Sequence, residues 1–343
     1  MRDFPSPLRD LDMHKRLSGL LAVLSLSVSA FAISPADVAT TDIRKLVDVK
    51  SIKGAKGAKR VAVPGYRVIF TTRSKVTARA EDWLGGVGGG SSSGAKASME
   101  VVLGNVEFET LQKIADAAYA DLIADLKEGG MEVVPLETIT ASPSFQKMKM
   151  TGSTADKPYT KKSRDKNTSY LVVSPSQIPL WFTNWDGDIS DQGMSQTNIR
   201  AIMAMSKELD ALMLYPIMHV DFASLGATGG KFARRASVQA KAAIYANPAY
   251  TLFYIANDKG GAFARMHDGI GVEGDPGEFV TADQASNEAF IGSMQKIGID
   301  FGPVKSKKNM VLQTNRENFH SLAYEALTGT NEAFRRALQE AQK

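Results

Sequence analysis

The chain has 343 residues, no cysteine and a formal net charge of +4 at pH 7. Without cysteine it can form no disulfide bond, thiolate nucleophile or cysteine-ligated metal site, and it cannot carry a lipid on a cysteine. The length suffices for one large or two ordinary domains with a buried core. So small a net charge does not by itself indicate a class of partner.

Residues 13–32 have the pattern of a bacterial secretory signal, with a basic start, an apolar run and Ala30-Phe31-Ala32 before the cut. The alternative is a membrane anchor. The run from Leu17 is about sixteen residues long and contains several serines, whereas a spanning helix needs about 20 apolar residues. We therefore predict that residues 1–32 are removed, that translation starts at Met13, and that the chain works in the periplasm, at the outer membrane or outside the cell.

Residues 33–60 form a basic lead-in to the first strand. Between Arg44 and Arg60 seven basic residues face one acid, Asp48. Such a segment can touch anionic lipid head groups, lipopolysaccharide or peptidoglycan, and the alternative is a solvated connection. The candidate contacts are Lys53, Lys56, Lys59 and Arg60.

Two strands with a glycine- and serine-rich insertion follow. Alternation of side-chain type predicts strands over 61–80 and 98–106. The residues between them hold too little apolar surface to order themselves, so they form a long hairpin tip, and Trp83 and Leu84 are its candidate contacts with a membrane or a partner. The run from Gly89 to Ser98 is not a phosphate-binding loop, because alanines interrupt the required Gly-Lys-Ser order.

Helical periodicity is strongest from Phe108 to Lys127, where the helix ends at Gly129-Gly130 before a strand over 131–136. Strand, helix and strand in this order indicate a crossover helix packed on a sheet. The polar residues 138–169 predict an exposed connection. Further predicted strands cover 170–173, 212–222, 236–245 and 249–257, and further helices cover 197–209, 283–297, 315–325 and 331–342.

These elements predict an α/β fold in which a mixed sheet is flanked by helices and carries a long Gly/Ser-rich hairpin insertion. We place the α/β domain at 61–265 and a helical C-terminal extension at 266–343.

Four segments carry a resemblance to a known family: VAVPGYRVIF (61–70), LQKIADAAYADLIADLKEGGMEVVP (111–135), SKELDALMLYPIMHVDF (206–222) and AYTLFYIANDKGGAFAR (249–265). Over residues 60–265 the chain resembles the periplasmic domain shared by the curli secretion channel family and relatives of the TolB amino-terminal domain. The resemblance implies an assembly, scaffold or transport accessory that binds partners without catalysis. The curli channel inserts long hairpins into the outer membrane. Here the face of Thr72, Ser74 and Val76 is weakly apolar, so we expect a soluble hairpin.

Three other readings stay open. Asn184, Asp186, Asp188 and Asp191 form either a calcium loop or a polar turn, and they lack the spacing of the familiar twelve-residue motif. His219 and Asp221 lie two residues apart on a predicted strand and therefore share a face, as a metal pair or a base and its orienting group in a hydrolase would.

The aromatic residues Trp181, Phe182 and Trp185 would suit a solute or glycan binder if they lined an open groove.

We therefore expect a non-enzymatic, periplasmic accessory of cell-envelope assembly or secretion. Its expected partners are further copies of the chain, secretion-system proteins, and the outer membrane or peptidoglycan. No cofactor and no nucleic acid is expected.

Overall fold

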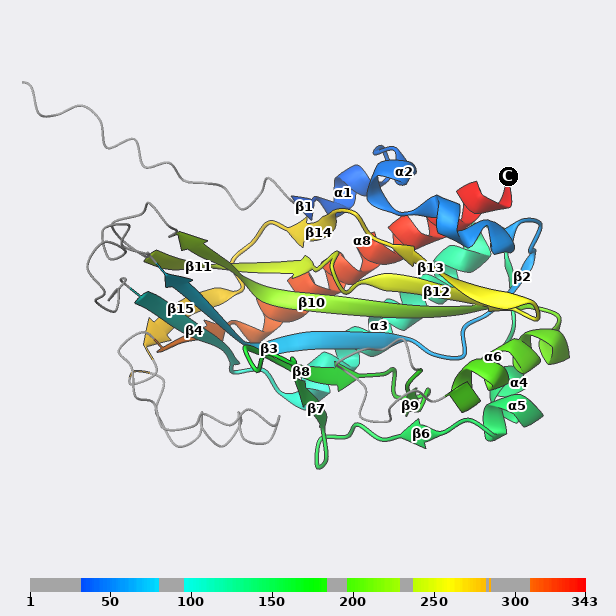
Figure 1. The fold of residues 1–343 in the computed structure, drawn as a ribbon, viewed down its shortest axis with the longest axis horizontal. Coiled ribbons are helices and arrows are strands. Elements are labelled where there is room, and N and C mark those ends of the chain that lie inside the picture. The colour runs from blue at the N-terminus through cyan, green and yellow to red at the C-terminus, as the bar shows by residue number, and fades with distance from the viewer. Residues whose placement is uncertain (1–31, 80–95, 184–195, 229–236, 282–283, 285–308) are drawn as a thin grey trace, which may run out of the picture.

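The computed structural model describes residues 32–79, 96–183, 196–228, 237–281, 284 and 309–343 (Figure 1). Within these ranges fourteen strands form one mixed sheet, and helices cover both of its faces. The predicted α/β class, with a mixed sheet, a long hairpin and a C-terminal helix, is confirmed. None of the described helices is long and apolar enough to cross a membrane.

Two long hairpins form the middle of the sheet. The first joins β3 (Arg67–Arg79) to β4 (Lys96–Gly104), and the second joins β10 (Leu212–Thr228) to β11 (Ser237–Ala246). Strands β10 and β3 pair in parallel, so the order is β11-β10-β3-β4. Figure 1 shows the free ends of both hairpins at the same end of the molecule.

The remaining strands extend this centre. The path through the sheet is β1-β14-β11-β10-β3-β4-β16-β15, and a separate ribbon pairs β6 with β9. Their bounds are β1 Ala32–Ile33, β2 Arg60–Ala62, β5 Glu132–Val133, β6 Met150–Thr151, β7 Tyr159–Lys162, β8 Thr168–Val173, β9 Leu180–Trp181, β12 Leu252–Asn257, β13 Gly260–Arg265, β14 Gly269–Val272, β15 Gly277–Thr281 and β16 Asn309–Thr314.

One face of the sheet is covered by α3 (Phe108–Glu128) and α8 (Arg316–Gln342). Helix α3 has the bounds and the buried apolar face that the periodicity predicts. It ends at Gly129, and the following Gly130 adopts a φ of 84° that favours glycine. Helix α8 packs on the sheet through Phe334, whose ring stacks on Phe253 of β12 at 4.7 Å between centroids.

Helix α8 is one continuous helix, so the prediction of two helices over 315–325 and 331–342 is wrong. The sequence Thr328-Gly329-Thr330 looks like a break, but Gly329 lies in a close approach. A Cβ atom there would meet Pro35 and Ile270 at 3.0 Å. The glycine therefore lets the helix run past its neighbours without ending.

Residues 266–343 are not only a helical extension, because β14, β15 and β16 belong to the central sheet.

The basic lead-in is folded, so the alternative of a solvated connection is wrong. It forms α1 (Pro35–Val38), α2 (Ile43–Leu46) and the 3-10 helix η2 (Val49–Ala55), all of which contact α8 or the strands beside it. The side chains of Val38, Leu46 and Ile52 are fully buried. Its apolar residues thus anchor the segment while its lysines stay exposed.

The other face of the sheet carries α4 (Leu136–Ala141), α5 (Pro143–Gln146) and α6 (Gln196–Leu209) near one end. The prediction for α6 is confirmed, whereas the exposed connection predicted over 138–169 is wrong. Ile139, Phe145 and Met148 are buried in that stretch and fix short helices that a mostly polar sequence does not reveal.

Candidate functional site

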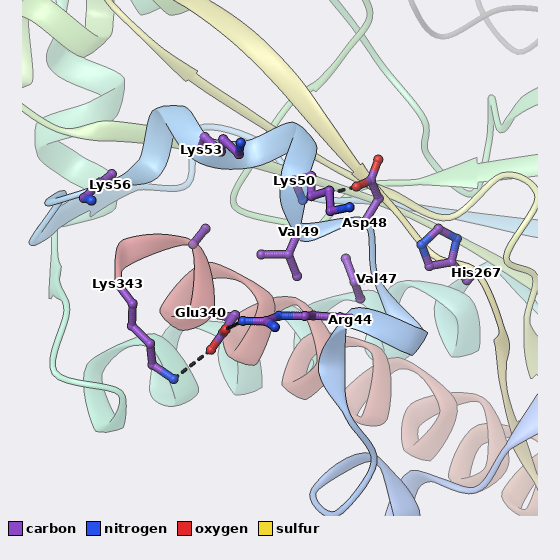
Figure 2. Close-up of a pocket in the computed structure, with 11 residues that line it drawn as sticks. Arg44, Val47, Asp48, Val49, Lys50, Lys53, Lys56, His267, Glu340 and Lys343 are labelled. Atoms are coloured by element: carbon purple, nitrogen blue, oxygen red, sulfur yellow. Dashed lines mark hydrogen bonds and ion pairs between the residues drawn. The ribbon is translucent and has the colours of Figure 1, made fainter.

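A basic pocket of about 690 Å³ lies between η2 and the last turns of α8 (Figure 2). Hydrogen bonds between main-chain atoms hold its walls together. The amide of Asp48 donates to the Arg265 carbonyl at 2.9 Å, and the amide of His267 donates to the Leu46 carbonyl at 2.8 Å. Segments far apart in the sequence are therefore fixed side by side. The lining side chains are Arg44, Val47, Asp48, Val49, Lys50, Lys53, Lys56, His267, Glu340, Ala341 and Lys343.

Cations outnumber acids around this pocket. Five lining side chains are lysine or arginine and two are carboxylates. Glu340 is held from two sides, by the Lys343 ammonium at 2.7 Å and by the Arg44 guanidinium. The bond from Lys343, and next the bond from Arg44, keep the pKa of Glu340 below its ordinary value. Figure 2 shows Lys53 on η2 and Lys56 directly after it, across from this group.

The four basic residues predicted as contacts fall into two groups. Lys53 and Lys56 line the pocket, but Lys59 does not. Arg60 is also outside it and forms an ion pair with Glu132, with 3.2 Å between nitrogen and oxygen, where β2 pairs with β5. The structure thus brings together only half of the four basic residues proposed from the sequence.

Six charged or histidine residues of the lining escaped the sequence prediction as members of one site: Arg44, Asp48, Lys50, His267, Glu340 and Lys343. Arg44 belongs to the basic run, so its charge was visible. Glu340 and Lys343 are three residues apart on a helix, which signals an ion pair but not a pocket. Nothing in the sequence places His267 beside residues more than two hundred positions away.

The interpretation of Trp181 as part of an open groove is wrong. Its side chain is 1 % exposed, it stacks on Tyr215 at 4.0 Å between centroids, and its Nε1 donates to the Pro64 carbonyl at 3.1 Å. Phe182 is also fully buried, with the Arg67 guanidinium 4.2 Å above its ring. This cluster supports the fold, and it offers a solute no surface.

The Arg67 guanidinium in this cluster is fully buried. It donates hydrogen bonds to the Trp181 carbonyl and the Tyr215 hydroxyl. Burial of a guanidinium is tolerated where its donors find acceptors and its face lies on aromatic rings.

His219 and Asp221 do share a face of β10, as their spacing predicts. The His219 Nε2 atom lies 2.9 Å from the Thr71 hydroxyl and 3.6 Å from a carboxylate oxygen of Asp221. The edges of two tyrosine rings, Tyr170 and Tyr250, pack on the imidazole at 5.2 and 5.1 Å between centroids. The histidine is therefore enclosed by its neighbours.

The Asp221 carboxylate accepts hydrogen bonds from three side chains in this cluster. The Asn247 amide donates to it at 2.6 Å, and the hydroxyls of Thr71 and Tyr245 also donate to it. Burial lowers the pKa of His219, and Asp221 offsets part of that effect. Among the described residues no three His, Cys, Asp or Glu side chains gather as a metal site would need. The geometry is that of a neutral histidine in a structural network.

Several predicted features lie outside the described residues. These are the secretory signal up to residue 31, the contacts Trp83 and Leu84, the oxygen-rich loop from Asn184 to Asp191 with Trp185, and, apart from Gln284, the helix over 283–297. The predictions for them stay predictions.

The outer half of β11 forms an edge of the sheet. Strand β11 pairs with β10 along its length, but it pairs with β14 only through Ile244–Ala246. Within the described ranges, Val238–Ala243 therefore have a ladder partner on one side alone. Their side chains are half-buried or exposed, and Lys241 is the one charge among them.

Comparisons with protein-family models, curated proteins and solved structures gave no match to this chain.

Proposed function

We propose that this chain is a non-catalytic accessory of cell-envelope assembly or secretion that works in the periplasm by associating with further copies of itself or with envelope proteins. The observation that carries the proposal is the edge of β11 beside the paired hairpins. A strand edge presents unpaired N–H and C=O groups, and these form hydrogen bonds with a strand of another chain. Proteins that stay monomeric usually protect such an edge with charges, prolines or bulges.

Two features support a contact role over catalysis. His219, the best candidate base, is buried and enclosed by Tyr170 and Tyr250, so its imidazole is not open to a substrate. Trp181, the best candidate for a carbohydrate platform, is inside the core. The exposed features are instead a strand edge and a charged pocket, which suit binding.

The absence of cysteine allows a direct test with single reactive thiols. Gln239 is exposed on the β11 edge, and Lys147 is exposed beside α5 at the other end of the molecule (Figure 1). In Gln239→Cys the thiol should react with a maleimide about tenfold more slowly when the protein is concentrated enough to assemble, because the partner strand covers it. In the control, Lys147→Cys, the labelling rate should not change.

Equal labelling of Gln239→Cys at low and high concentration, together with a monomer mass by light scattering, would contradict self-association. Protection of both cysteines would place the contact somewhere other than the β11 edge.

A further inference from the structure

The basic pocket has an arrangement of charge that the assembly role does not use. Its walls come from α2, η2, the turn after β13 and the end of α8. Main-chain hydrogen bonds fix the first three together, and the Gln342 side chain of α8 donates to the Ala58 carbonyl beyond η2. The pocket is thus part of the folded scaffold. It does not depend on the conformation of a single lysine-rich segment.

Three lysines that line the pocket, two in η2 and one directly after it, form no ion pair with a carboxylate among the described residues. In the part of the chain that the structure describes, the ammonium groups of Lys50, Lys53 and Lys56 have no carboxylate within ion-pair distance. Glu340 is already shared by Arg44 and Lys343. Five cations and two carboxylates therefore leave a surplus of three positive charges around one cavity.

Such a surplus costs free energy through repulsion between like charges, and an anion in the cavity would relieve it. Here the fold adds Arg44 and Lys343 to the same cavity from two other elements. An excess of positive charge that several elements bring to one cavity favours the binding of an anion there.

We propose that this pocket binds a phosphate-bearing anion. A phosphate group suits several separate cations, because it carries up to two charges and three acceptor oxygens that can each take a hydrogen bond. The cavity is larger than one phosphate, and Val47, Val49 and Ala341 give it an apolar floor. It therefore has room for an organic group attached to the phosphate, as in a phospholipid head group. The inference stands independently of the proposed assembly role.

The test compares two triple variants that remove the same charge. Lys50→Gln, Lys53→Gln and Lys56→Gln together remove the three lysines that lack acids. The control carries Lys45→Gln, Lys59→Gln and Lys113→Gln, which change exposed lysines outside the pocket. Any difference between the triples therefore reflects the pocket, since the net charge is the same.

Two probes separate the sources of phosphate. One arm measures binding of inorganic pyrophosphate by calorimetry. The other measures flotation of the full chain with vesicles of phosphatidylglycerol in phosphatidylcholine, against phosphatidylcholine alone. In at least one arm the pocket triple should bind roughly tenfold more weakly than wild type, and the control triple should change by less than about threefold.

Binding to both probes would indicate recognition of the phosphate itself, and binding only to vesicles would indicate a lipid head group. Absence of binding in both arms, or equal weakening in the two triples, would overturn the proposal.

A fourth variant acts in the opposite direction. Glu340→Gln removes the carboxylate that occupies Arg44 and Lys343, so it should free both cations and strengthen binding by about threefold or more. Weaker binding in this variant, with the fold intact by circular dichroism, would also contradict the proposal.

Discussion

Gly65 is the residue at which a single added atom should disturb the buried aromatic cluster. A Cβ atom there would lie 2.6 Å from the Tyr215 ring and 2.7 Å from the Trp181 ring, and both rings are fully buried. Gly65→Ala should therefore lower the free energy of unfolding by about 1–3 kcal/mol, the usual cost of overpacking a core. Denaturant titration followed by tryptophan fluorescence measures this change.

The matched control is Gly152→Ala, since an added Cβ would meet nothing within 4 Å there. That variant should change the free energy of unfolding by less than about 0.5 kcal/mol. If Gly65→Ala is equally harmless, the aromatic packing described here is wrong.

His219 predicts a dependence of stability on pH. Burial holds the pKa of His219 below its ordinary value in the folded chain, while in the unfolded chain the imidazole titrates near about 6.5. Below that pH the unfolded chain binds more protons. The part of the stability that depends on His219 should therefore be complete above about pH 6.5 and fall by up to about 1.4 kcal/mol per pH unit toward the folded pKa.

Denaturant titrations between about pH 6.5 and 5.5 test this slope. His219→Gln should remove most of it, and His267→Gln, at an exposed position, should leave it unchanged. The same slope in wild type and His219→Gln would show that another group is responsible.

Charge and residue type could predict some site residues and not others. Lys53 and Lys56 could be predicted as surface contacts, because they belong to a run of like charges and such a run is rarely part of a core. Trp181 misled because an aromatic residue looks the same in a sequence whether it lines a groove or fills the core. His267 could not be found, because its neighbours in space are set by strand pairing across the whole chain.

At the scale of elements, α3 and α8 share an acidic contact that should weaken the fold at high pH. Burial, and next the charges of Asp121 and Glu332, raise the pKa of Asp125 to about 6. Because this value lies above the unfolded pKa, the associated stability is present below about pH 4 and is lost as the pH rises through about 6.

Asp125→Asn should therefore raise the free energy of unfolding at pH 7.5 by about 0.5–1 kcal/mol. This value is reduced because the carboxylate is partly exposed to solvent. Near pH 4 the substitution should have little effect. Glu109→Gln, an exposed change in the first turn of the same helix, should give no such gain. A loss of stability in Asp125→Asn at pH 7.5 would contradict the account of this contact.

Elements with strong periodicity were predicted well, and those fixed by a few contacts were not. The apolar faces of α3 and α6, the nearly continuous apolar run of β10 and the alternation in β11 are each long enough to identify the element. Helices α4 and α5 each bury a single apolar side chain, Ile139 and Phe145, which gives no period to detect. Helix α8 continues through Gly329 because of its neighbours, and these are invisible in the local sequence.

At the scale of the whole molecule, the two proposed binding features lie on different parts of the fold. The paired hairpins, with the β11 edge, extend toward one end, while the basic pocket lies where η2 meets the end of α8 (Figures 1 and 2). The sheet joins them through β10, which pairs with both β11 and β12. A chain of this design can bind an anion and a partner strand at the same time.

The central claim is that this molecule acts by associating with further copies of itself, and its molar mass in solution tests that claim most directly. Light scattering of the chain without its predicted signal should give a defined multiple of the protomer mass, with Gln239→Cys protected from labelling in the same samples. A strict monomer at every concentration up to about 100 μM, where even weak specific contacts are populated, would contradict it.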